Sequence, residues 1–224
     1  MKILILEGAS GSGKTTSLRN LDPNETIIIA PNDKELPWPG WKKQGWHKRI
    51  VKTDDLAKIK KTIKLVAETR PDVKQIIIED FTHAQTAVTR SEQFMAAGKS
   101  KNPYTRWEEF GVSVHNAVFS LTGLRDDLTV IVINHTDQDG TGYASFKTFG
   151  KMVGNSTMPT SYCTIVLHSI VLPDKPIDQR YVFVTNDDGL HEAKSPMGMF
   201  DQEYIPNDLA PVLKRIQEYA NENA

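Results

Sequence analysis

Six short runs of apolar residues have the length of β-strands and are spread along the whole chain. They cover residues 3–6, 26–30, 75–78, 129–133, 164–167 and 181–184. The middle runs are continuous Ile and Val, a pattern typical of parallel strands that are buried on both faces. Four segments, at 14–21, 54–69, 107–124 and 211–219, have the spacing of helices. Strands that alternate with helices predict an open, mostly parallel α/β sheet flanked by helices.

The pattern changes after about residue 160, where two strand-like runs are separated by a turn sequence. Pro173-Asp174-Lys175-Pro176 divides the runs, which predicts an antiparallel hairpin at the edge of the sheet over about 161–200. A final helix is expected within 207–224, with Asn207-Asp208 as its cap. The chain has no internal repeat, low-complexity tract or linker rich in Pro and Gly, so we expect a single domain over 1–224.

Composition excludes several classes of protein. The chain has 27 Lys and Arg against 28 Asp and Glu, and this balance gives no general attraction to nucleic acid. No apolar run approaches the roughly 20 residues of a membrane span, so we expect no membrane partner. The apolar start is expected to be a buried strand, because it runs into Glu7-Gly8 without a cleavage pattern. The single cysteine, Cys163, excludes a disulfide framework and a cysteine-based zinc site, and it suits a reducing cytoplasm.

The strongest motif is a glycine-rich loop directly after the first predicted strand. It matches G-x-x-x-x-G-K-[ST] without a mismatch. Backbone N–H groups of such a loop point at phosphate oxygens, and a helix beginning near Lys14 would add its positive end. Lys14 would reach the β- and γ-phosphates, and the Thr15 hydroxyl would bind Mg²⁺. The motif predicts a site for ATP and Mg²⁺, with the phosphates held by Gly8, Ala9, Ser10, Gly11, Ser12, Gly13, Lys14, Thr15 and Thr16.

Acidic residues follow two of the predicted strands. The run at 75–78 leads into Glu79-Asp80, a pattern that places a carboxylate beside the metal, usually through a water. Adjacent strand residues point to opposite faces, so only one of these two acids can face the magnesium, and the sequence leaves both open. Asp33 and Glu35 follow the strand at 26–30 and are candidates for orienting the attacking water, because ligands of open α/β sheets lie beyond the strands' carboxyl ends.

The order of these motifs resembles that of the RecA-like ATPases. A phosphate loop and an acidic strand are followed by the strand at 129–133, which ends in Asn134-His135. In RecA-like ATPases the corresponding strand ends in Asn-Gln and senses the γ-phosphate. The resemblance covers roughly residues 1–170 and implies a sensing role for His135, which stands where a glutamine is usual.

The chain is also similar to a phage-encoded family of short P-loop proteins, which includes compact RecA-like proteins of single-strand annealing and recombination. The similarity is carried by the stretches at 11–16, 36–37, 51–55, 124–128, 147–152 and 193–200. It implies an ATPase that acts on single-stranded DNA in the cytoplasm of an infected host cell. It also implies a homo-oligomer, with a single-strand-binding or replication protein as a further partner.

The resemblance implies two loops that touch single-stranded DNA. The first, at 96–104, contains Lys99 and Lys101, and the second, at 136–160, contains Phe146, Lys147 and Lys151. Cations interleaved with aromatic rings suit a single strand, because bases stack on the rings while phosphates pair with lysines. A second interpretation stays open, in which cations complete the site of a neighbouring subunit in a ring or filament. The candidates for that role are Lys147, Lys151 and Lys194.

Two other functions stay open. The first is a nucleotide-switched accessory protein that binds a partner in phage replication or packaging with little turnover. The second, a small-molecule kinase, is less favoured, because the arginines that would form a phosphate-clamping lid are sparse and scattered. Trp38, Trp41 and Trp46 could stack on a base, but packing of their loop over the sheet edge is the favoured interpretation.

Overall fold

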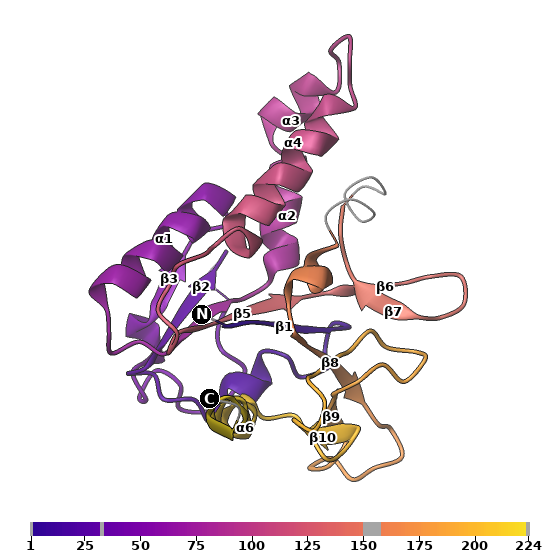
Figure 1. Ribbon diagram of the computed structural model, residues 1–224. Helices are drawn as coiled ribbons and strands as arrows, with labels where there is room; N and C mark the ends of the chain where they lie inside the picture. Colours follow the sequence, from indigo (N-terminus) through magenta and orange to yellow (C-terminus); the bar gives the residue numbers. More distant parts are fainter. Residues whose placement is uncertain (1, 32–33, 150–157, 223–224) are drawn as a thin grey trace.

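A mostly parallel sheet of eight strands forms the centre of the computed structural model, which describes residues 2–31, 34–149 and 158–222 (Figure 1). The strand order is β10-β9-β8-β1-β5-β4-β2-β3. From β8 to β3 all neighbouring strands are parallel, whereas β9 is antiparallel to β8 and β10 is antiparallel to β9. The strands are β1 (Lys2–Gly8), β2 (Thr26–Ala30), β3 (Ile50–Lys52), β4 (Gln75–Ile78), β5 (Thr129–Asn134), β8 (Ile165–Val171), β9 (Tyr181–Val184) and β10 (Tyr204–Pro206).

The expected fold class is confirmed as a mostly parallel α/β sheet with helices on its faces and an antiparallel C-terminal edge. Each of the six apolar runs lies on a strand of this sheet. The sequence analysis missed β3 and β10, which have only three residues each. Residues 136–160, after β5, are expected from the resemblance to form a loop that touches DNA. The first part of that region instead folds as an antiparallel hairpin of β6 (Thr136–Gln138) and β7 (Ala144–Phe146).

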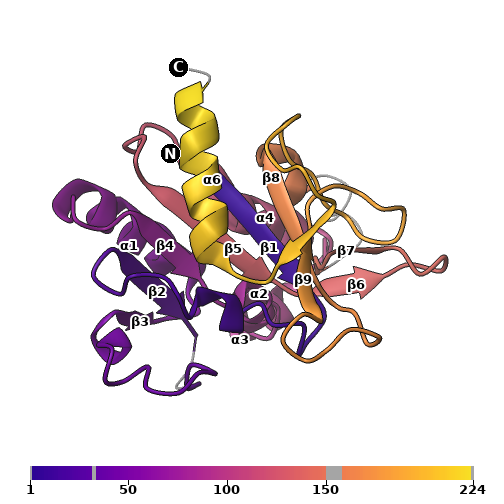
Figure 2. The same cartoon turned by 90° about the horizontal axis from the view of Figure 1, so that it is seen from below.

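Helices cover both faces of the sheet (Figures 1 and 2). Alternate residues of β1 enter two separate cores, because successive side chains of a strand point to opposite faces. Ile5 packs with residues of α1 (Leu56–Thr69), α2 (Phe81–Thr89) and α4 (Thr105–Val114). Leu4 and Leu6 pack with residues of α6 (Leu209–Glu222) on the other face. In the described ranges, no helix has both the length and the apolar character needed to cross a membrane.

The predicted helix at 14–21 is wrong, because only a 3₁₀ turn of three residues, Thr16–Leu18, forms there. The chain turns at Asp22, whose Oδ1 accepts a hydrogen bond from the backbone N–H of Asn24, and enters β2 four residues after Asp22. A helix this short is marginal by itself. Instead, α6 covers this part of the sheet, and Leu18 packs in the same core as Leu209 and its neighbours on α6.

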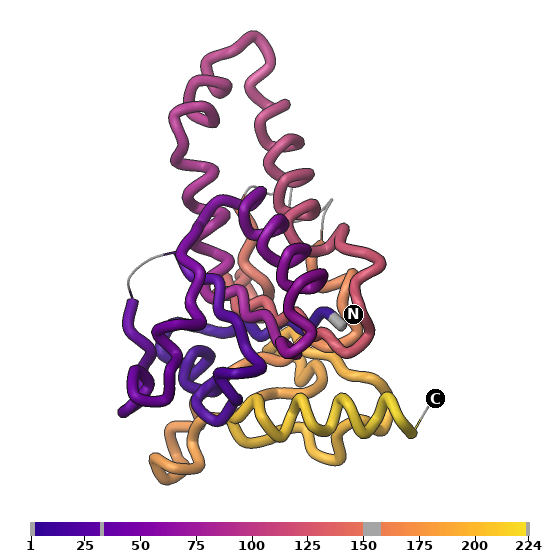
Figure 3. The backbone as a smooth tube through the Cα atoms, turned by 90° about the vertical axis from the view of Figure 1, so that its left-hand side faces the viewer, coloured from indigo at the N-terminus to yellow at the C-terminus, as the bar shows by residue number. Residues whose placement is uncertain are grey.

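A helical protrusion, defined here as residues 81–114, stands away from the sheet (Figures 1 and 3). It consists of α2, α3 (Glu92–Ala97) and α4, joined by short turns. Edge-to-face contacts join the rings of Phe94, Trp107 and Phe110, and the guanidinium of Arg106 lies over the rings of Phe94 and Trp107. The predicted helix at 107–124 corresponds to α4 and to a π-helical turn at His115–Phe119, which ends the helix earlier than expected.

Candidate functional site

The glycine-rich loop curls at the carboxyl end of β1, as its sequence requires. Gly8, Gly11 and Gly13 all have positive φ angles of +150°, +81° and +95°, a backbone conformation that favours glycine. A Cβ atom on Gly8 would lie 2.4 Å from the carbonyl oxygen of Ser169, so the loop passes β8 too closely for any side chain at this position.

A chain of buried hydrogen bonds supports the loop from below. Ser169 on β8 donates from its hydroxyl to the carbonyl oxygen of Ser12 at 2.6 Å, and the Asn207 side-chain amide donates to the Ser169 hydroxyl at 2.8 Å. Arg19 in turn donates to the carbonyl oxygen of Asn207 at 2.9 Å. The conformation of the loop therefore depends on the end of β8 and on Asn207, which lies two residues before α6. We call Ser12, Ser169 and Asn207 the loop brace.

Lys14 folds back over the loop. Its ammonium donates hydrogen bonds to the carbonyl oxygens of Gly8 and Ala9 at 2.8 and 2.7 Å. Burial lowers the pKa of Lys14 to about 8, so at neutral pH most of the side chain still carries its charge. Phosphate oxygens would offer this ammonium charged acceptors in place of two neutral carbonyls.

Glu79 and Asp80, which the sequence could not separate, take different positions. The Thr15 hydroxyl donates to Glu79 Oε1 at 2.6 Å, and Glu79 is buried. Among the described residues Glu79 Oε2 has no hydrogen-bond partner, and burial raises the pKa of the carboxyl. Asp80 has a φ of +55° and caps α2 by accepting a hydrogen bond from the backbone N–H of His83. The structure therefore places Glu79, rather than Asp80, against the hydroxyl at the end of the loop.

His135 lies beside Asp80 at the same end of the site, with Nε2 at 3.8 Å from Asp80 Oδ1. Burial and the charge of Lys14 lower the pKa of His135, so its ring is neutral at pH 7. The preceding residue, Asn134, is fully buried. Its side chain accepts from the Thr82 hydroxyl at 2.8 Å and donates to the carbonyl oxygen of Lys147 at 3.1 Å.

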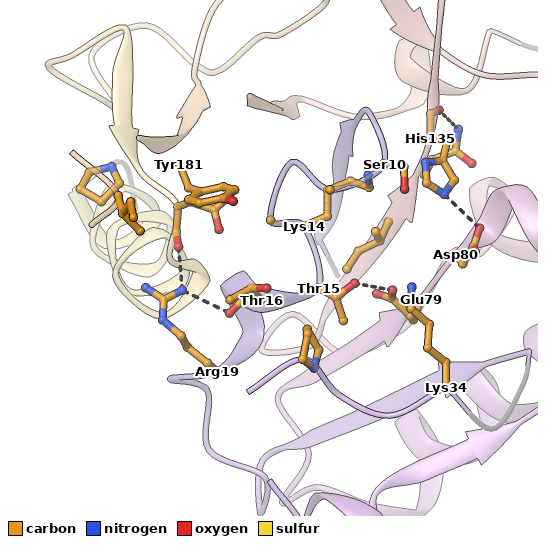
Figure 4. A pocket seen from close by; sticks show the side chains of 18 of the residues that line it. Ser10, Lys14, Thr15, Thr16, Arg19, Lys34, Glu79, Asp80, His135 and Tyr181 are labelled. Carbon is orange, nitrogen blue, oxygen red and sulfur yellow. Dashed lines mark hydrogen bonds and ion pairs between the residues drawn. The ribbon is translucent and has the colours of Figure 1, made fainter. Parts of the chain in front are cut away.

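These groups line a single pocket of about 520 Å³ with two chemically different ends (Figure 4). Lys14 and Thr15 lie in the middle, and Glu79, Asp80 and His135 form the acidic end. The opposite end, which we call the aromatic end, is formed by Thr16, Arg19, Ile177, Asp178, Tyr181, Pro206 and Asn207. Tyr181 and Ile177 are 40% and 75% exposed, so both offer apolar surface to whatever enters.

The sequence analysis missed the aromatic end and the loop brace. Tyr181 was seen only as the start of a strand, and Asn207 only as a helix cap. Asp208 Oδ1 does accept from the N–H of Ala210 at the start of α6, so the cap exists beside the second role of Asn207. No spacing relates these residues to the glycine-rich loop, since only the folded sheet brings them to it.

Other predicted site residues do not line this pocket. Glu35 is exposed and pairs with Lys42 at 2.5 Å, and it lines a smaller neighbouring cavity together with Thr15, Glu79 and Asp80. Its fellow candidate Asp33 lies outside the described residues. The connection between α3 and α4 forms the tip of the helical protrusion (Figure 1). Lys99 and Lys101 belong to this connection and are exposed.

The second predicted DNA loop needs a correction. Phe146 is only 8% exposed and packs in the core, because it ends β7 with its side chain turned toward the sheet, so its ring is not available for stacking on a base. The ammonium of Lys147 pairs with Asp137 at 2.8 Å. Lys194 is exposed, while its backbone pairs with Val166. Lys151 lies outside the described residues.

Comparisons with known proteins give only a distant likeness. No model of a protein family matches the sequence, and no curated protein matches it. Among solved structures, a KaiC-like protein from the hyperthermophilic archaeon Pyrococcus horikoshii is similar, with 12% sequence identity and a TM-score of 0.44. The similarity covers 82% of this chain and 77% of that one.

Proposed function

We propose that this chain binds a nucleoside triphosphate together with Mg²⁺ and hydrolyses it, with ATP as the expected substrate. The observation that carries the proposal is the contact between Thr15 and Glu79 beside a glycine-rich loop with positive φ angles and a buried lysine. This set of groups provides backbone N–H donors, an ammonium and hard oxygen ligands within one pocket. A triphosphate with its magnesium ion needs all three.

The two ends of the pocket favour a nucleotide over a simple polyphosphate. The phosphates would lie along the loop and end near Glu79. The base would then reach the aromatic end, where Tyr181 and Ile177 offer a ring and an aliphatic side chain. Stacking on an aromatic ring contributes about 1–3 kcal/mol for a base.

The residues of the acidic end fit a magnesium ion. Thr15 and Glu79 supply a hydroxyl and a carboxylate, which are ligands that Mg²⁺ prefers, and Glu79 Oε2 is buried without a partner in the described part of the chain. The ion, when bound, would neutralise the charge that develops on the transferred phosphoryl group. Asp80 and His135 supply the polar groups for orienting the attacking water.

The test compares binding of ATP and of inorganic tripolyphosphate by calorimetry in three proteins. In the unmodified protein, ATP should bind more tightly than tripolyphosphate. Tyr181→Ala should weaken ATP binding by about fivefold to about a hundredfold and leave tripolyphosphate binding unchanged. Tyr204→Ala is the matched control, because Tyr204 has a similar exposure on β10 but does not line the pocket.

Three results would contradict parts of the proposal. Absence of binding of either ligand would reject the phosphate site, and equal affinity for the two ligands would reject the base site. Binding without release of inorganic phosphate from ATP would reject hydrolysis. A fourth protein, Lys14→Met, lacks the ammonium. It should bind neither ATP nor tripolyphosphate and should release no phosphate from ATP.

We also propose that the protein acts on single-stranded DNA through the tip of the helical protrusion. Lys99 and Lys101 are exposed there close to Tyr104, which is 67% exposed, and this combination of cations and ring suits a single strand. Lys99→Ala/Lys101→Ala should weaken binding of a single-stranded oligonucleotide and reduce the salt dependence of that binding. The matched control, Lys61→Ala/Lys64→Ala on α1, removes the same charge from another exposed face and should have no effect.

A homo-oligomer with trans-acting cations is part of the same proposal. The exposed Lys194 is the candidate that keeps a free surface position among the described lysines named for this role. Mass determination with and without ATP should show assembly in its presence. Lys194→Ala should then lower hydrolysis and leave ATP binding unchanged, and a monomer under both conditions would reject this part.

A further inference from the structure

A row of three buried polar side chains crosses the central strands directly below the glycine-rich loop. Glu7 on β1 is in register with Asn134 on β5 and with His168 on β8, so all three lie on the same face of the sheet. Glu7 is 0% exposed, and Gly8, the first residue of the loop, follows it. The row therefore lies in the apolar interior at the point where the sheet meets the proposed phosphate site.

The row is covered by a small layer of backbone. Ala144 on β7 exchanges backbone hydrogen bonds with Leu190 and Glu192, and Glu192 Oε2 also accepts from the N–H of Phe146. His168 Nδ1 lies 3.3 Å from the carbonyl oxygen of Glu192. The hydrogen bonds of His168 thus connect this covering layer to Glu7.

Glu7 has no cationic partner among the residues that the structure describes. Its Oε1 lies 3.1 Å from His168 Nδ1, and its Oε2 has no hydrogen-bond partner there. Burial, with the charge of Glu192 added, raises the pKa of Glu7 well above its usual value, and Lys14 opposes this. Burial, with His191 added, lowers the pKa of His168 to about 4, so its ring is neutral at pH 7.

Among the residues that the structure describes, the charged or titratable groups around Glu7 belong to four elements. The glycine-rich loop contributes Lys14, and β8 contributes His168. The turn before β7 contributes Tyr143. The segment after β9 contributes the remaining groups, which are Asp187, Asp188, His191 and Glu192. These groups form hydrogen bonds or ring contacts or act on Glu7 through space. Lys14 and the N–H that His168 directs at Oε1 favour a charged Glu7, whereas burial and the charge of Glu192 oppose it.

We propose that Glu7 is a positioning residue of the glycine-rich loop that works in its protonated, uncharged form, and that loss of its proton weakens binding of the triphosphate. The inference rests on the proposed nucleotide site. In the protonated carboxyl, Oε1 still accepts a hydrogen bond from the Nδ1–H of His168. The same N–H also points at the carbonyl oxygen of Glu192. An ionised Glu7 would place a buried negative charge beside the negatively charged triphosphate. Charges in the protein interior interact strongly, because water does not screen them there.

The test measures the affinity for metal-free tripolyphosphate from about pH 5 to about pH 9 in the unmodified protein and in Glu7→Gln. The amide is a neutral substitute for the protonated carboxyl. Below the pKa of Glu7, at the acid end of this series, the two affinities should agree within about twofold. Above the pKa of Glu7 the unmodified protein should lose about tenfold per pH unit relative to Glu7→Gln. Lys14 also loses its proton at high pH, and an ionised Glu7 raises the pKa of Lys14, so Glu7→Gln loses this charge at a lower pH than the unmodified protein. This difference acts against the expected result, so a greater loss of affinity in the unmodified protein reports Glu7.

A second variant keeps the inference testable if Glu7→Gln does not fold. Glu192→Gln removes the charge that raises the pKa of Glu7 and retains an amide oxygen for Phe146. The weakening should then begin at a lower pH than in the unmodified protein, because less charge opposes ionisation of Glu7. Parallel affinity curves for Glu7→Gln and the unmodified protein would overturn the role of Glu7 and leave the nucleotide site intact. Absence of tripolyphosphate binding at every pH would overturn both.

Discussion

The buried pair of Glu7 and His168 predicts a specific dependence of stability on pH. Burial lowers the pKa of His168 from 6.5 to about 4. Between these pH values His168 binds a proton in the unfolded chain but not in the folded protein. Stability is therefore lost as the pH falls through this window. The full loss is about 3 kcal/mol, of which about 2 kcal/mol has already occurred at pH 5.

Glu7 acts with the opposite sign. Its pKa is raised in the folded protein, so the folded state binds the proton more tightly than the unfolded chain does. The stability that this provides is present at low pH and is lost as the pH rises from the usual range of a glutamate toward the raised value. In the unmodified protein the two residues oppose each other, and the effect of His168 is partly hidden.

Substituting Glu7 should make the contribution of His168 to the pH dependence of stability measurable. We expect Glu7→Gln to lose more stability than the unmodified protein when the pH falls from about 7 to about 5. In Glu7→Gln/His168→Gln the loss of stability over the same pH range should be smaller than in Glu7→Gln by about 2 kcal/mol, because His168 no longer titrates. The assay is urea unfolding at several pH values, followed by circular dichroism, with the free energy extrapolated to water.

The comparison of the single and double variants isolates His168, since all other carboxylates and histidines titrate in both. If the stabilities of the two variants fell in parallel between about pH 7 and about pH 5, the ring of His168 would not be held neutral by burial. The role proposed for Glu7, which requires an uncharged His168 beside it, would then be contradicted as well.

Three further outcomes follow from particular contacts. Gly8→Ala should abolish nucleotide binding and lower the unfolding free energy by about 1–3 kcal/mol in thermal melts, because its Cβ would lie 2.4 Å from the Ser169 carbonyl oxygen. Asn207→Ala should weaken tripolyphosphate binding several-fold in calorimetry through loss of the loop brace, whereas Asn221→Ala, at the exposed end of α6, should not. Trp46→Ala should cost about 3–5 kcal/mol in urea unfolding, since the ring is 0% exposed, and retained stability would contradict its place in the core.

Much of the sheet could be predicted because its signals are local. Continuous Ile and Val runs define β2, β4 and β5, and the apolar stripe of α1 is visible in the sequence. The favoured interpretation of the tryptophans also agrees with the structure, since Trp38 and Trp46 are buried edge-to-face with ring centroids 5.7 Å apart. In each case the deciding contacts involve residues that are close in the chain.

The errors have one physical cause, which is contact with distant parts of the chain. Whether 14–21 becomes a helix depends on the space that α6 occupies, and nothing in that segment reveals α6. Phe146 belongs to a polar stretch and yet enters the core, because β7 lies over β1. At the candidate site, the motif predicts the phosphate end, but Ser169, Tyr181 and Asn207 reach it only through the order of the strands.

The different positions of Glu79 and Asp80 depend on the backbone conformation, which the sequence alone does not reveal. Both acids follow β4, and alternation alone says that they diverge without saying which one meets the loop. The positive φ of Asp80 turns the chain into α2 and directs this carboxylate to the helix cap. Glu79 is left on the side of Thr15, which only the folded backbone reveals.

The loop brace also makes the shape of the glycine-rich loop depend on contacts between residues that are far apart in the sequence. Ser169 lies 157 residues after Ser12, and Asn207 lies 38 residues after Ser169. The loop can therefore reach its supported conformation only after β8 has paired with β1 and Asn207 has reached the Ser169 hydroxyl. Folding of the sheet, and not the local sequence of the loop, completes the candidate site.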